Sequence, residues 1–181
     1  MNSRKNRSAD LCSIALMTAV TAVMAQITIP MPLGVPMTMQ TFAVTLAAVV
    51  LGAKRSAISM TIYLLLGMAG VPVFAGFRGG LQCLAGPASG FLISFPLMAF
   101  LIGLGVRWAK EKRWIYVLFL IAGTLANYGV GTIIFCLVMK ASISTALAAC
   151  VLPFIPTAII KAVFGSLIGF QVRRRAHIQY V

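Results

Sequence analysis

Residues 114–139 read WIYVLFLIAGTLANYGVGTIIFCLVM and contain no charged side chain, while Arg113 and Lys140 stand directly on either side. A helix of this length extends about 39 Å, which exceeds the roughly 30 Å thickness of a bilayer hydrocarbon core. Trp114 and Tyr116 near its start suit the aromatic belt at a membrane interface. The stretch therefore predicts a transmembrane helix.

Further apolar runs lie on both sides of this stretch. In the whole chain of 181 residues, 61% are hydrophobic and 9% are charged, against about a quarter charged in soluble domains. The other runs cover 11–29, 38–52, 57–68, 87–106 and 144–170. We predict an all-α integral membrane protein, a compact bundle of six transmembrane helices. It forms a single domain, 1–181, with a basic start at 1–10, the bundle at 11–172 and a basic tail at 173–181.

The placement of charge predicts the orientation of the bundle. Fifteen Lys and Arg oppose only Asp10 and Glu111, which gives a net charge of +13. Six helices with a cytoplasmic N-terminus put on the inner side Arg4, Lys5, Arg7, Lys54, Arg55, Arg107, Lys110, Lys112, Arg113, Arg173, Arg174 and Arg175. Arg78 and Lys140 lie in outer loops, and Lys161 lies within a span. Since Lys and Arg concentrate on the cytoplasmic side, both termini are predicted there, and nucleic-acid binding loses support.

The same composition excludes several kinds of activity. Carboxylates within the membrane serve proton relays and ion-coupled carriers, and no Asp or Glu falls within a predicted span. No G-x-x-x-x-G-K-[ST] motif is present, and His177 in the tail has no neighbouring ligands for a metal. We expect no enzyme activity, no metal and no cofactor. If the chain transports a solute, another subunit supplies the energy.

Lys161 is the exceptional charge, because it lies about halfway along the run 144–170. A cation at the centre of a transmembrane helix costs about 2.5–3.5 kcal/mol on the translocon insertion scale. No intramembrane carboxylate can pair with it, so an anionic ligand is the expected counter-ion. Backbone carbonyls, water, or snorkelling of the long side chain to an interface are the alternatives.

Two other regions carry polar or flexible groups. Residues 70–90 are rich in glycine, and the segments 76–80, GFRGG, and 86–90, GPASG, form either a ligand cradle or a turn that lets two helices pack. A regular lipid-facing helix is excluded there, because its backbone groups would lack partners. Asn127 and Tyr128, within the run 114–139, need a partner inside the protein or on a ligand.

Three stretches together resemble a known family. They are 30–44, PMPLGVPMTMQTFAV, then 70–80, GVPVFAGFRGG, and 86–90, GPASG. Their order and spacing resemble those of the biotin-specific substrate-binding subunits of energy-coupling factor transporters, along nearly the whole chain. The resemblance implies a multi-pass protein of the prokaryotic cell membrane that captures biotin from outside. It also implies two kinds of partner, a transmembrane coupling subunit and a pair of ATP-binding-cassette ATPases that hydrolyse ATP.

The resemblance also assigns roles to individual residues. Ala15 and Ala19 fit the family's A-x-x-x-A surface, which contacts the coupling subunit. Lys161 matches the basic member of a P-x-D-x-x-K motif. Together with the residue chemistry above, this gives the candidate biotin-binding residues Thr38, Gln40, Phe77, Arg78, Gly79, Gly80, Gly86, Asn127, Tyr128 and Lys161. Lys161 is expected to meet the carboxylate or a carbonyl of the ligand.

Two departures from the family pattern leave alternatives open. Ala158 stands where the P-x-D-x-x-K motif has its acid, and the family's G-P-T-G-G reads GPASG at 86–90. A binding subunit for a different small anionic vitamin is therefore the first alternative. A membrane scaffold that binds no solute and a self-powered carrier are others, and the first run could be a signal peptide.

Overall fold

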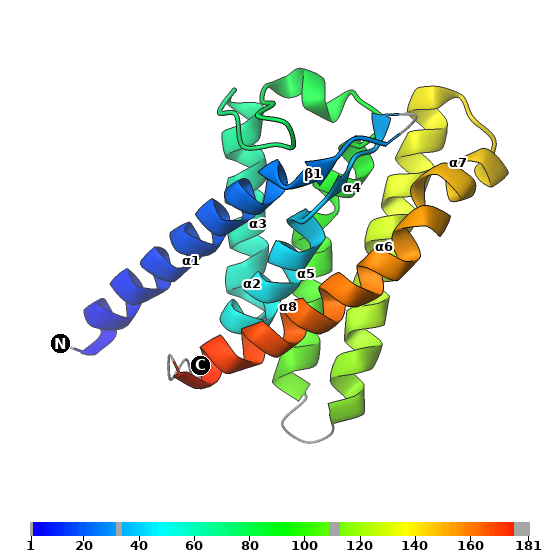
Figure 1. Ribbon diagram of the computed structural model, residues 1–181. Coiled ribbons are helices and arrows are strands. Elements are labelled where there is room, and N and C mark those ends of the chain that lie inside the picture. Colours follow the sequence, from blue (N-terminus) through cyan, green and yellow to red (C-terminus); the bar gives the residue numbers. More distant parts are fainter. Residues whose placement is uncertain (1, 32–33, 109–112, 176–181) are drawn as a thin grey trace.

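The computed structural model describes residues 2–31, 34–108 and 113–175, and the side chains of 7–31, 34–108 and 114–175. Its helices form one bundle, and both ends of the chain lie at the same end of it (Figure 1). A short antiparallel hairpin and the glycine-rich segment lie at the opposite end. The observed elements, in chain order, are α1 Asn2–Gln26, β1 Thr28–Ile29, β2 Met37–Thr38, α2 Gln40–Leu51, α3 Ala53–Met68, η2 Leu81–Leu84, α4 Ser89–Ile93, α5 Phe95–Trp108, α6 Arg113–Met139, α7 Ile143–Cys150, η3 Leu152–Phe154 and α8 Ile155–Arg175.

Every predicted apolar run falls largely on helix, but the extents differ. The run 38–52 is helical only from Gln40 to Leu51, and the helix of the run 57–68 begins earlier, at Ala53. The run 11–29 belongs to a helix that begins earlier, at Asn2, and ends at Gln26, because Thr28 pairs with Thr38 and Ile29 with Met37 in the hairpin. The run 87–106 is divided at Ser94, since Pro96 lacks the N–H that would continue the helical ladder. The run 144–170 is divided by the 3₁₀ turn η3, which carries Pro153.

Length separates the helices into two groups. Three segments are long and apolar enough to cross a membrane, namely Arg7–Gln26, Trp114–Met139 and Ile143–Arg175. By contrast, α2 has 12 residues and α3 has 16, which correspond to about 18 and 24 Å of helix. The molecule is therefore a helical membrane protein with three clear spanning segments and shorter helices packed among them.

The core is built around α2, in which every residue except Thr41 is buried. Its sequence, QTFAVTLAAVVL, is apolar around nearly the whole circumference, and such a helix is stable only when other helices surround it. On α8, Gly169 lies so close that a Cβ there would stand 2.7 Å from the Cβ of Val49. A small residue thus lets the two helices approach.

A sharp turn at Gly52 separates α2 from α3. Gly52 has φ 77° and ψ 178°, a left-handed region that favours glycine. Gly103 of α5 packs directly on this turn, where an added Cβ would come 2.4 Å from the Ala53 nitrogen. The turn is therefore held tightly against α5.

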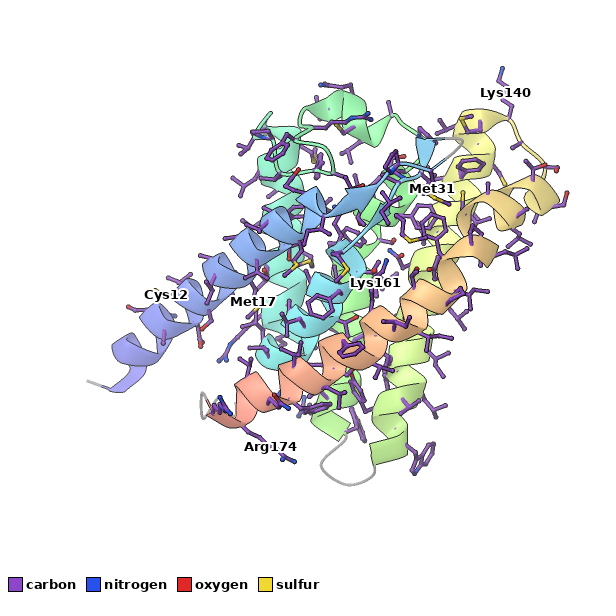
Figure 2. The ribbon with its side chains drawn as sticks, viewed as in Figure 1. Cys12, Met17, Met31, Lys140, Lys161 and Arg174 are labelled. Carbon is purple, nitrogen blue, oxygen red and sulfur yellow. The ribbon has the colours of Figure 1, made fainter. Side chains whose placement is uncertain are left out.

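Charged side chains gather at the end of the bundle that holds the termini, which we call the basic end. Asp10 forms an ion pair with Arg55 at 2.8 Å, and Arg173 donates from Nη1 to the Val49 carbonyl at 3.0 Å. Asp10 does not precede the first helix, as the sequence predicted, but lies within α1. Arg174 lies at the same end, and Lys140 lies at the other (Figure 2).

Several charged or titratable residues that the sequence predictions used lie outside the described residues. They are Lys110, Glu111, Lys112 and His177, together with the side chains of Arg4, Lys5 and Arg113. The placement of charged side chains at the basic end, opposite Lys140, is therefore based on the other charged residues.

Candidate ligand-binding site

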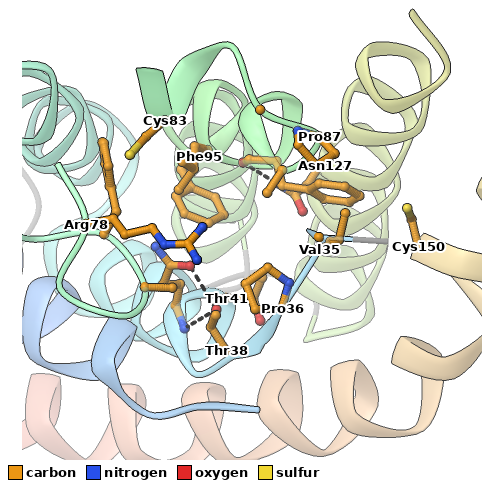
Figure 3. Close-up of a pocket in the computed structure, with 18 of the residues that line it drawn as sticks. Val35, Pro36, Thr38, Thr41, Arg78, Cys83, Pro87, Phe95, Asn127 and Cys150 are labelled. Atoms are coloured by element: carbon orange, nitrogen blue, oxygen red, sulfur yellow. Dashed lines mark hydrogen bonds between the residues drawn. The ribbon is translucent and has the colours of Figure 1, made fainter. Parts of the chain in front are cut away.

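A cavity of about 240 Å³ lies at the other end of the bundle, which we call the cavity end (Figure 3). The hairpin loop, the start of α2, the glycine-rich segment and helices α4 to α8 all contribute to its walls. Much of the lining is apolar, including Val35, Phe74, Phe91, Leu92, Phe95 and Phe154. A smaller set of polar and charged side chains interrupts this surface, and such a mixture is typical of small-molecule sites.

Seven of the ten predicted binding residues line this cavity. They are Thr38, Gln40, Arg78, Gly86, Asn127, Tyr128 and Lys161. These residues come from segments up to 123 positions apart, because Thr38 is in the hairpin and Lys161 is in α8. The fold thus gathers most of the predicted set in one place.

Lys161 has a partner within the protein. Its Nζ donates to the backbone carbonyl of Thr38 at 2.8 Å, and the side chain is half-buried. A backbone carbonyl was an alternative in the sequence analysis, where an anionic ligand was the expected partner. The bond stabilises the ammonium group but supplies no negative charge to balance it.

A second pocket lies on the other side of the cavity wall that Lys161 and Thr38 form. It is a groove of about 470 Å³ between the end of α1, the hairpin, α2 and α8, and its lining is apolar apart from two threonines and Lys161. Thr38 and Lys161 line both the groove and the cavity. The bond between them is therefore part of the partition between the two spaces.

Gln40 is held by a buried chain of hydrogen bonds. Thr38 donates from Oγ1 to Gln40 Oε1 at 2.9 Å, and Gln40 Nε2 donates to the Tyr63 hydroxyl at 2.6 Å. The Tyr63 hydroxyl in turn donates to the Val73 carbonyl at 2.9 Å. The chain links the hairpin, α2, α3 and the glycine-rich segment, and it fixes the Gln40 amide.

Asn127 is arranged differently, because only one side of its amide is used by the protein. Its Nδ2 donates to the Phe91 carbonyl at 2.9 Å and to Ser94 Oγ at 2.8 Å. Its carbonyl oxygen faces the cavity in Figure 3, and no donor among the described residues bonds to it. Asn127 is 2% exposed, so this acceptor is available only to a molecule inside the cavity.

Arg78 reaches the cavity from a tight turn in the glycine-rich segment. Backbone bonds join Phe74 N to the Arg78 carbonyl at 2.9 Å and Arg78 N to the Phe74 carbonyl at 3.3 Å. The guanidinium group stands at the cavity in Figure 3 and makes no hydrogen bond or ion pair with the described residues. The guanidinium group can therefore donate to an anionic ligand without first breaking a bond to the protein.

Three predicted binding residues are not in the cavity wall. Phe77 points away from the protein with 72% of its surface exposed. Gly79 and Gly80 serve the turn, because a Cβ on Gly79 would lie 2.5 Å from the Val71 carbonyl and Gly80 has φ 94°. These two glycines therefore fit the prediction of a turn that allows close packing better than the prediction of a ligand cradle.

Sequence reasoning found the charged residues of the cavity but missed the aromatic residues that shape it. Phe91 and Phe95 line it, and Tyr63 anchors Gln40 from behind. Each lies in or beside an apolar helix, where aromatic residues are common, so the sequence contains no signal that separates them from ordinary core. Ala158, by contrast, is absent from the described lining of the cavity.

Ala15 and Ala19 do not line the cavity and lie on the exposed face of α1. Leu11, Leu16 and Val23 are on the exposed surface of the same helix, each more than half exposed. Two alanines on one face, four residues apart, leave a shallow strip where another helix can approach closely.

Comparison with known proteins gives a consistent result. The sequence model described as the BioY family matches residues 1–178. The probable biotin transporter BioY of Pyrococcus horikoshii is 37% identical over 170 residues, which cover 92% of this chain and 98% of that protein. The biotin transporter BioY of Thermotoga maritima is also 37% identical, over 165 residues that cover 91% of this chain and 96% of that protein.

A solved structure also matches this fold. It is the crystal structure at 2.1 Å of the S-component for biotin from an ECF-type ABC transporter. The two chains superpose with a TM-score of 0.85 and are 28% identical in sequence, and the match covers 96% of this chain and 94% of the other. The arrangement of helices around the cavity is therefore shared with a protein of that kind.

Proposed function

The chain belongs to the BioY family, and we propose that it captures biotin and serves as the substrate-binding subunit in its uptake through an ECF-type transporter. The observation that carries this proposal is the cavity, which combines apolar walls with two cations and an unused amide oxygen. The relatives named as biotin transporters cover more than nine-tenths of the chain. The lining of the cavity and the similarity to these relatives are independent lines of support.

The chemistry of biotin fits this lining. Biotin is a monoanion with an apolar tail and a ureido group that both donates and accepts hydrogen bonds. Phe91 and Phe95 offer apolar surface for the tail, and Asn127 offers an acceptor for a ureido N–H. Arg78 and Lys161 supply positive charge, so the net charge of the ligand is favoured inside the cavity.

The difference between the two cations favours one orientation of the ligand. Arg78 is in an exposed loop and has no acceptor among the described residues, whereas Lys161 is half-buried and bonded to Thr38. A charged carboxylate is costly to bury, so its best place is beside Arg78, near solvent. The ureido group then lies toward Asn127 and Lys161, whose Nζ can donate to the ureido carbonyl.

A different anionic vitamin is the second candidate, and its support is Ala158. The acidic residue of the family motif is missing there, and one polar contact to a ureido N–H could be missing with it. Ala158 does not line the described cavity, however, and Asn127 offers an acceptor of its own. Biotin is therefore the ligand that we propose.

We propose that the bundle crosses the membrane six times with both termini in the cytoplasm. The spans are α1, α2, α3, α4 with α5, α6, and α7 with α8. The basic end then faces the cytoplasm, as expected from the preference of Lys and Arg for that side, and the cavity end faces outward. We assign the protein to the prokaryotic cell membrane because the family resemblance implies that location.

The partners that we propose are a transmembrane coupling subunit and a pair of ATP-binding-cassette ATPases. The sequence has no P-loop, so ATP hydrolysis belongs to those ATPases. The strip around Ala15 and Ala19 is exposed and free of polar side chains that would need burial, which suits contact with a helix of the coupling subunit.

Titration of the purified protein with biotin tests this function. The measurement is isothermal calorimetry in detergent, with a panel of other anionic vitamins at the same concentrations. Saturable binding of biotin alone supports the proposal, saturable binding of another vitamin supports the second candidate, and no binding of any favours a scaffold. Uptake of labelled biotin in cells with and without coupling subunit and ATPases separates a subunit from a self-powered carrier.

A further inference from the structure

Gln26, the last residue of α1, contacts the glycine-rich segment at three backbone groups. Its Nε2 donates to the Val73 carbonyl at 3.4 Å and to the Phe74 carbonyl at 3.2 Å. Its Oε1 accepts from the Phe77 N–H at 2.8 Å. The amide therefore uses its donor and its acceptor together, one on each side of the turn that leads to Arg78.

The two sides of this turn are held in different ways. Phe74 is 2% exposed and packs edge-on against the Tyr63 ring, with centroids 5.5 Å apart. Phe77 is exposed and has φ 56°, a left-handed conformation that is rare for residues with a side chain. Packing thus anchors the first side, and the second side relies on hydrogen bonds.

Phe77, the residue with this unfavourable conformation, is the one whose N–H donates to Gln26 Oε1. Arg78 follows directly and is joined to Phe74 by two backbone hydrogen bonds. Its guanidinium group lines the cavity without an acceptor among the described residues, so no bond of its own side chain fixes it there. The direction of Arg78 consequently depends on the backbone of the turn.

We propose that Gln26 is a positioning residue that holds the turn 74–78 so that Arg78 faces the ligand. The inference rests on the proposed function, since it concerns affinity for the anionic ligand of that cavity. Only an amide fits the three contacts. Its Nε2 also donates to the Ala22 carbonyl at 3.0 Å within α1, so a carboxylate at this position would face three carbonyl oxygens. A thioether would offer neither a donor nor a strong acceptor.

A double-mutant cycle on the full chain tests the inference. Biotin affinity is measured for wild type, Gln26→Met, Arg78→Gln and the double variant, with Gln171→Met on the exposed surface of α8 as the matched control. We expect about tenfold weaker binding for Gln26→Met and no further loss when it is added to Arg78→Gln, because Gln26 acts through Arg78. The control should bind as wild type does.

Two results would overturn the inference. One is an affinity of Gln26→Met within twofold of wild type, and the other is a double variant whose loss equals the product of the two single losses. If Gln26→Met does not fold, Gln26→Asn, which is one methylene shorter, replaces it under the same criteria.

A readout without ligand separates this inference from the proposed function. Trypsin cleaves after arginine, and a turn released from Gln26 should be cut after Arg78 about tenfold faster than in wild type or Gln171→Met. Arg78→Gln removes the cleavage site and identifies the product. Faster cleavage in a protein that binds no biotin would refute the function and retain the positioning role, whereas unchanged cleavage would refute the positioning role.

Discussion

The two ends of the bundle differ in the partners that their polar side chains have within the protein. At the basic end, Asp10 pairs with Arg55, and Arg173 bonds to a backbone carbonyl of α2. At the cavity end, the Arg78 guanidinium and the Asn127 carbonyl face a cavity and have no partner among the described residues. A polar group without a partner costs stability, so proteins keep such groups where a ligand completes them. The basic end is therefore held by contacts within the protein, whereas the cavity end exposes polar groups to the cavity without such contacts.

The largest expected effect comes from removing Lys161, the half-buried cation at the cavity end. Lys161→Ala should weaken biotin binding about 100-fold, because it deletes a charged donor and also the bond that holds Thr38 in the partition. Calorimetry in detergent measures this. The matched control is Lys140→Ala, at the same end of the bundle but outside the cavity, which should bind normally. Unchanged affinity of Lys161→Ala would refute its role.

The second prediction concerns the exposed cation at the same end. Arg78→Gln should weaken biotin about 30-fold but weaken the neutral amide of biotin only about threefold, because the guanidinium pairs with the carboxylate in our orientation. Equal losses for both ligands would show that the carboxylate lies elsewhere. In that case Lys161→Ala should be the variant that discriminates between the two ligands.

At the basic end, the expected effects are on stability alone. Gly169→Ala places a Cβ 2.7 Å from Val49 Cβ and should lower stability by about 1–2 kcal/mol, seen as a lower melting temperature in detergent. Gly129→Ala is the matched control, because nothing lies within 4 Å of its Cβ. That change should be neutral or slightly stabilising, since alanine favours helix. Biotin affinity should be unchanged in both, and a loss of affinity in Gly169→Ala alone would link the two ends.

The smallest expected effect is that of the ion pair at the basic end. Asp10→Asn should lower stability by less than about 1 kcal/mol, because both side chains are partly exposed and water screens their attraction. A melting curve at low and high salt measures it, with the difference from wild type vanishing at high salt. A large loss that persists at high salt would mean that Asp10 has a role beyond this pair.

Sequence reasoning succeeded where the signal lies in consecutive residues. The six apolar runs all fall largely on helix. Arg174 and Lys140, which were assigned to opposite sides of the membrane, lie at opposite ends of the bundle. It was less accurate at helix ends. The first helix ends three residues early at Gln26 because the strands of the hairpin pair with each other, and that pairing depends on residues eight or more positions away.

The candidate site was predicted in part for the same reason. Residue chemistry drew attention to Arg78, Asn127 and Lys161, and all three line the cavity. It equally drew attention to Phe77, whose side chain points outward because of a backbone conformation that sequence does not reveal. The contacts of Gln26 with the turn could not be predicted, since a glutamine at the end of an apolar helix has no distinguishing sequence pattern.

The sequence by itself determined that this is a membrane protein made of helices with its positive charge concentrated at one end. Hydropathy and charge are properties of each segment, and transfer into a bilayer acts on one segment at a time. Only the tertiary structure decided which polar groups are satisfied within the protein. Lys161 bonds to the Thr38 carbonyl 123 residues away, and Gln26 accepts from the Phe77 N–H 51 residues away. The Arg78 guanidinium and the Asn127 carbonyl oxygen have no partner among the described residues. A hydrogen bond depends on a distance of about 3 Å in space, which the order of residues along the chain does not encode directly.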